Sequence, residues 1–138
     1  MSRQTIYRTA AGSAVIALTF GLGVAVGQQS APTENKGIKI SPPTSIELGQ
    51  EVEGVEGRQL RLRIVTVDPG GVVGVHSHKG RPAVAYMLQG TLTEHVEGGA
   101  THDRRQGESW TEGKEVTHWA ENKGNETAVI VAVDVFKP

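Results

Sequence analysis

The chain has 138 residues, a formal net charge of −1 and no cysteine. This length fits a single domain, and the scattered charges do not form the basic patch that binds nucleic acid. The absence of cysteine excludes disulfides, thiolate metal sites and a cysteine nucleophile. The 18 glycines indicate many tight turns, which favour an all-β protein over a helical one.

Residues 1–27 have the pattern of a signal peptide. Arg3 and Arg8 precede an apolar run at residues 10–26, which ends in small residues. A basic segment, an apolar segment and a small-residue site in this order predict cleavage near Gly27, and hence a periplasmic or secreted protein, in a bacterium. The alternative is an uncleaved membrane anchor, although the run is short for a span of about 20 residues. In either case, this segment is the only predicted contact with the membrane.

Residues 28–41 are polar and predict a linker or extended arm. Within this segment, residues 38–40 would add a short edge strand that the following prolines end. Residues 42–138 then form the predicted domain. Its first long strand covers residues 58–67, where Leu60 and Leu62 alternate with Arg61 and Arg63. This alternation predicts that the leucines face the core and the arginines face water.

A turn is predicted at residues 68–71, which read Asp-Pro-Gly-Gly. Further strands are expected at residues 72–78, 83–88, 91–96, 100–105, 109–111, 116–121 and 127–136. Tyr86 and Met87 are expected in the core, with the alternative that either lines the cavity. About eight short strands, closely spaced and without a convincing helix, predict a small antiparallel barrel or jelly roll. Such a barrel has no open edge and holds one small ligand.

Two histidines, His76 and His78, lie one residue apart in a predicted strand. Residues i and i+2 of a strand point to the same face, so the two imidazoles form half of a metal site. His118 also lies in a predicted strand and is a candidate third ligand. Three imidazoles on one face of a cavity hold a divalent cation and leave positions open for water or substrate.

The two stretches that carry these histidines resemble the two motifs of the cupin superfamily. The first motif is G-x5-HxH-x3,4-E-x6-G, and the second is G-x5-PxG-x2-H-x3-N. Here the first corresponds to His76, His78 and Gly90, and the second to Gly107, His118 and Asn122. The resemblance implies a cupin barrel (a double-stranded β-helix), a divalent metal ion held by the three histidines, and a homodimer.

The chain departs from the first motif at Ala83, which occupies the position of the glutamate ligand. Alanine cannot bind a metal, so three neutral histidines remain. Glu94, on the neighbouring predicted strand, is an alternative ligand. Gly113 and Glu115 replace the proline and glycine of the second motif. The ion, whether Fe, Mn, Ni, Cu or Zn, would keep its full charge, and it should therefore favour anionic ligands.

Two function classes agree with this site. One is a metal-dependent enzyme acting on a small molecule, such as a dioxygenase, isomerase or lyase, in which the catalytic residues are unknown. The other is a non-catalytic protein of the cell envelope that binds a small anion, a metabolite or the metal itself. A degenerate cupin without metal remains a third reading because of Ala83. The other histidines, His95 and His102, fall in or beside a hairpin and are expected to be solvated.

Overall fold

The computed structural model describes residues 30–138, whose regular secondary structure is almost entirely β-strand. One 3-10 turn, η1 (Leu48–Gln50), interrupts them. The nine strands are β1 (Lys36–Ile40), β2 (Thr44–Glu47), β3 (Gln59–Ser77), β4 (Ala83–Gln89), β5 (Thr91–Val96), β6 (Thr101–Arg105), β7 (Ser109–Glu112), β8 (Thr117–Glu121) and β9 (Ala128–Phe136). The edge strand expected at residues 38–40 is therefore present as β1.

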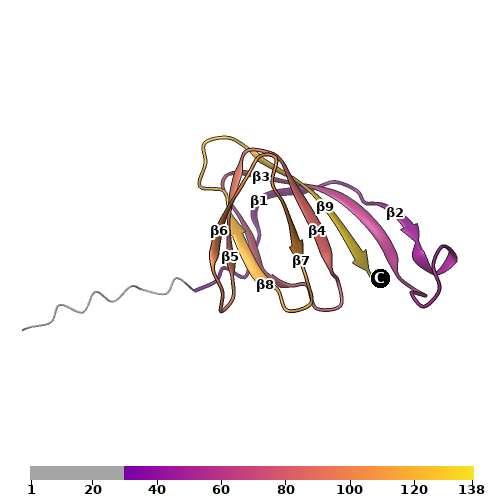
Figure 1. The fold of residues 1–138 in the computed structure, drawn as a ribbon. Helices are drawn as coiled ribbons and strands as arrows, with labels where there is room; N and C mark the ends of the chain where they lie inside the picture. The colour runs from indigo at the N-terminus through magenta and orange to yellow at the C-terminus, as the bar shows by residue number, and fades with distance from the viewer. Residues whose placement is uncertain (1–29) are drawn as a thin grey trace, which may run out of the picture.

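The strands form one antiparallel, curled sheet in the order β6-β5-β8-β3-β9-β4-β7, and β1 and β2 also pair with β3 (Figure 1). The all-β prediction is confirmed. The expected closure is wrong in one respect, because the hydrogen-bonded order of the described strands has two ends, β6 and β7. These two strands follow each other in the chain, and a turn at Gly107, with φ of 90°, joins them.

Strand β3 is longer than predicted, because the expected turn at residues 68–71 does not separate two strands. The chain bends there and continues, with Gly70 at a φ of 72°. The Gly70 N–H donates to the carbonyl of Asn122, and the Asn122 N–H donates to the carbonyl of Gly71. These bonds continue the ladder across the bend, so β3 pairs with β9 before it and with β8 after it.

The alternation in the first half of β3 is the reverse of the predicted one. Leu60 and Leu62 are each 39% exposed, whereas the side chains of Arg61 and Arg63 are only 12% and 19% exposed. The reason lies on β9, where Asp134 pairs directly with Arg61 and is buried. Directly paired residues share a face, so a buried carboxylate draws the arginines inward.

The apolar core lies at the opposite end of the same strands. Met87 is fully buried there as predicted, but Tyr86 is 43% exposed, because successive residues of a strand point to opposite faces. The core is formed by Val67, Ala85, Met87, Leu92, Ala120, Ala128 and Ile130.

The predicted signal peptide at residues 1–27 lies outside the described residues. Within residues 30–138, no helix is long and apolar enough to cross a membrane.

Candidate metal centre

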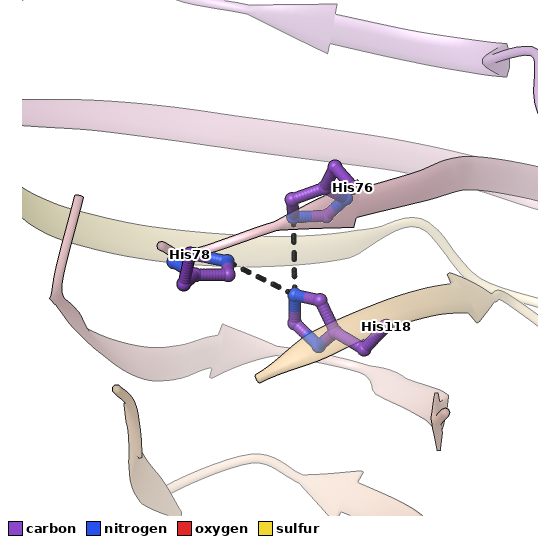
Figure 2. Close-up of side chains that lie close together, drawn as sticks. All are labelled: His76, His78 and His118. Carbon is purple, nitrogen blue, oxygen red and sulfur yellow. Dashed lines mark hydrogen bonds between the residues drawn. The ribbon is translucent and has the colours of Figure 1, made fainter. Parts of the chain in front are cut away.

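The structure brings together the three histidines that the sequence singles out. His76 lies near the end of β3, His78 lies just after it, and His118 lies on β8 directly opposite His76. Their rings point toward one another (Figure 2). Nε2 of His118 is 3.0 Å from Nε2 of His76 and 3.1 Å from Nε2 of His78. The i, i+2 spacing and the strand pairing produce this convergence.

The second ring nitrogen of each histidine faces a hydrogen-bond acceptor. Nδ1 of His76 is 2.9 Å from the carbonyl oxygen of Gly74, and Nδ1 of His78 is 3.2 Å from that of Arg81. Nδ1 of His118 lies against a carboxylate oxygen of Glu94. Because these oxygens accept, each Nδ1 must donate, and in a neutral ring Nε2 then carries a lone pair. Outer partners of this kind orient histidines that bind metals.

Glu94 supports His118 from behind and does not face the point where the Nε2 atoms converge. Its second oxygen accepts hydrogen bonds from Nε and Nη2 of Arg104, at 2.8 and 2.6 Å. Burial alone would raise the pKa of Glu94, but the hydrogen bonds from His118 and Arg104 outweigh burial and lower the pKa to about 2. Glu94 is therefore ionised at neutral pH, and the structure places it where it holds His118 in position.

His76 and His78 are neutral at pH 7, the form in which histidine binds a metal ion. Burial lowers the pKa of His78 to about 4, and the neighbouring His118 and Arg81 add to this shift. Burial also lowers the pKa of His76.

The donor set fits a divalent cation. Two nitrogens at about 2.1 Å from an ion and at a right angle stand about 3.0 Å apart. The two Nε2 separations match this distance. Three lone pairs that face one another without a proton between them repel, and a cation at their centre removes the repulsion.

A buried carboxylate that the sequence does not single out lies beside this centre. Oε2 of Glu112, at the end of β7, is 3.2 Å from Nε2 of His78, and Oε1 is 3.8 Å from Nε2 of His118. The indole N–H of Trp110 donates to Oε1 at 3.0 Å. The alternation of residues 109–112 places Trp110 and Glu112 on one face, but only the pairing of β7 with β4 shows that this face is the inner one.

The centre opens into a cavity of about 320 Å³. The polar side chains that line it include Arg63, Arg81, Glu112 and the three histidines. Arg63 contributes a buried Nε that has no hydrogen-bond partner among the described residues. A buried donor without a partner costs about 1–3 kcal/mol of stability.

The cavity arginines belong to a cluster around Asp134. Nε and Nη2 of Arg61 donate to the two oxygens of Asp134 at 2.9 and 2.8 Å. Arg63 and Arg81 donate to Oδ2 at 3.0 and 3.3 Å. Burial raises the pKa of Asp134, but the three guanidinium groups together lower it below its ordinary value. Three cations around one anion leave this side of the cavity positive.

The remaining candidates lie away from the centre. His102 is exposed as expected. His95 is half-buried, because it stacks on Trp119 at 3.9 Å and pairs with Glu121 at 2.8 Å. Asn122 is buried and donates to the carbonyls of Val67 and Glu126, so it fixes a turn as predicted. None of these contacts reaches the three histidines.

The sequence of this chain matches a known protein family. Residues 63–135 match the family model for the cupin domain, and this match covers more than half of the chain. The chain belongs to the cupin family. Comparison with curated protein sequences finds no match.

Solved structures share the fold at low sequence identity. The cupin domain of Schizosaccharomyces pombe Cnp3 has a TM-score of 0.56 and 13% identity, over 75% of this chain and 68% of that one. An oxalate oxidase in complex with the substrate analogue glycolate has a TM-score of 0.54 and 20% identity, over 75% and 53%. A predicted oxalate decarboxylase from Thermotoga maritima has a TM-score of 0.50 and 22% identity, over 68% and 91%.

Proposed function

We propose that this cupin binds one divalent metal ion through His76, His78 and His118, and a small anionic molecule beside the ion. The convergence of the three Nε2 atoms, each oriented by an acceptor at Nδ1, carries the proposal. A bound ion would act as a Lewis acid and lower the pKa of its water. The histidines keep it accessible from the cavity.

The preference for an anion rests on the charge of the cavity wall. Arg63 and Arg81 line the cavity and share one carboxylate, that of Asp134, with a third arginine. A carboxylate bridging the ion and these guanidinium groups would meet positive charge on both sides. Small carboxylates such as oxalate and glycolate are therefore the first ligands to test.

Catalysis and simple binding are the two outcomes of that test. An enzyme of the dioxygenase, isomerase or lyase type would consume oxygen or convert the carboxylate. A non-catalytic binding protein would hold it unchanged. Both carboxylates that line the cavity are hydrogen-bonded, which favours the binding protein. Glu94 accepts from His118 and Arg104, and Glu112 accepts from Trp110. Both carboxylates are thus held in place by hydrogen bonds.

The metal proposal is tested by elemental analysis and by Zn²⁺ titration of the metal-free full chain. Wild type should bind one ion per chain, and His118→Ala should lose it. His102→Ala is the matched control, because His102 is exposed on β6. Equally little metal in wild type and His118→Ala would show a degenerate barrel. Titration of the Zn²⁺ form with oxalate and glycolate, with Arg81→Ala for comparison, then tests the anion site.

We further propose a periplasmic or secreted location after cleavage near Gly27, from the pattern of residues 1–27. Expression of the full chain in a bacterium, followed by N-terminal sequencing, tests this. A mature chain that begins at Gln28 supports it. A retained Met1 in the membrane fraction indicates the anchor instead.

We also propose a homodimer that uses the outer face of β3, β9 and β4. Large apolar side chains there are 39–52% exposed: Leu60, Leu62, Val84, Tyr86 and Leu88. Leu62 and Val84 flank the same β9 residue, so the patch is continuous. Light scattering should give a dimer for wild type and a monomer for Leu62→Glu. A monomeric wild type would overturn this proposal.

A further inference from the structure

We propose that Glu112 is the fourth protein ligand of the metal, so that β7 supplies the carboxylate that β4 lacks at Ala83. This inference rests on the proposed metal site of three histidines. It concerns the one position at which the chain departs from the cupin ligand set.

The strand register brings the two positions together. Ala83, the first residue of β4, pairs directly with Glu112, the last residue of β7. Directly paired residues of an antiparallel ladder have Cβ atoms about 5 Å apart and point to the same face. Both residues are buried. A carboxylate carried by either strand therefore enters the same part of the interior, and the glutamate absent from one strand is present on its partner.

The contacts of Glu112 are those expected of a carboxylate that binds a cation. Its oxygens lie 3.2 Å from Nε2 of His78 and 3.8 Å from Nε2 of His118. Those nitrogens carry lone pairs, because their Nδ1 atoms donate elsewhere. A carboxylate and a lone pair repel at this distance unless a proton or a metal ion lies between them. The carboxylate of Glu112 and the Nε2 atoms of His78 and His118 thus face one region.

Trp110 orients the carboxylate. Its indole N–H donates to Oε1 of Glu112 at 3.0 Å, as outer-shell donors do for carboxylate ligands. The arrangement repeats the one at His118, which Glu94 and Arg104 hold from behind. Both ligand types are therefore held in position by the fold.

Moving the carboxylate from β4 to β7 has a consequence for the ligand. Ala83 also pairs with Asp134 on its other side, so it lies between Glu112 and the arginine cluster. Arg81 of this cluster lines the cavity together with Glu112 and the three histidines. A small anion in the cavity would therefore meet the proposed metal ion on one side and Arg81 on the other.

A swap of the two positions tests the inference. The probe is Co²⁺ added to the metal-free full chain, followed by calorimetry and by the visible absorption of the bound ion, which reports its ligands. Glu112→Gln should weaken Co²⁺ binding by more than about 100-fold, beyond the range for an outer-shell residue, and change the spectrum. Its amide oxygen still accepts from Trp110, so the fold should persist. Glu115→Gln, three residues away and exposed, should behave as wild type.

The double variant Ala83→Glu/Glu112→Ala returns the carboxylate to β4. It should recover Co²⁺ affinity to within about tenfold of wild type, because both positions reach the same region. Binding by Glu112→Gln that equals wild type would overturn the inference and leave the histidine site intact. So would a double variant that binds no better than Glu112→Gln. If wild type itself binds no Co²⁺, the proposed function fails with it.

Discussion

The first half of β3, together with β4 and β9, carries apolar side chains into the interior at one end and charged side chains at the other. At one end, Val67 and Met87 are fully buried among other apolar side chains. At the other end, Asp134 is buried and Arg61 is half-buried, and Arg81, three residues after His78, also donates to Asp134. The backbone is the same antiparallel ladder throughout. The strands therefore divide their length between an apolar part that stabilises the fold and a charged part beside the proposed site.

The difference shows how a small barrel stays folded although part of its interior is polar. The apolar end gains free energy by removing hydrocarbon from water, at about 25 cal/mol per Å². The polar end contains charges that must be stabilised by one another, and its arginines outnumber the carboxylate they share. A local excess of positive charge around Asp134 attracts an anionic ligand to this part of the cavity.

Removing the carboxylate at the centre of the polar end should have the largest effect. Asp134→Asn leaves three guanidinium groups without their shared partner, and breaking a buried ion pair costs about 3–5 kcal/mol. Urea unfolding of the full chain measures the loss. Exposed Glu115→Gln is the control. A loss equal to that of the control would show that solvent already stabilises the arginines.

Removing a buried side chain at the apolar end should lower the free energy of unfolding slightly less, and it should not change metal binding. Met87→Ala removes a fully buried side chain, for which about 2–5 kcal/mol of unfolding free energy is expected. Zn²⁺ titration of the folded variant should give the wild-type affinity, because Met87 does not line the cavity. Weaker metal binding would mean that the two ends are coupled.

Loosening the support of one histidine should have a smaller effect, confined to the site. Glu94→Gln replaces the ionised partner of His118 with a neutral one, and such outer-shell changes weaken metal binding about 10–100-fold. Calorimetry with Zn²⁺ measures the change. Affinity equal to wild type would show that the strand pairing alone orients His118.

The smallest effect is the pH dependence that Asp134 confers. Its pKa in the folded chain lies below the ordinary value of about 3.9, so its ionised form stabilises the fold. This contribution is complete above about pH 3.9 and is lost as the pH falls through the folded pKa. The stability gap between wild type and Asp134→Asn should be constant from pH 7 to pH 5 and narrow below. A gap that widens on acidification contradicts the lowered pKa.

The sequence was most informative where spacing alone fixes geometry. The pair His76 and His78 shares a face because a strand repeats every two residues. The turn residue Asn122 and the buried Met87 also follow from local pattern. The prediction for Arg61 and Leu62 was wrong, because alternation shows that two sets of side chains face opposite ways but not which face is inner. Asp134, more than 70 residues away, decides that.

By itself, the sequence determined an all-β cupin domain and the three histidines that converge in it, since short-range periodicity and motif spacing carry that information. Only the tertiary structure decided which carboxylates accompany them. Glu94 lies behind His118, and Glu112 lies beside the Nε2 atoms and opposite Ala83. Both facts depend on which strands pair and in which register, and pairing over long separations is set by the packing of the whole sheet.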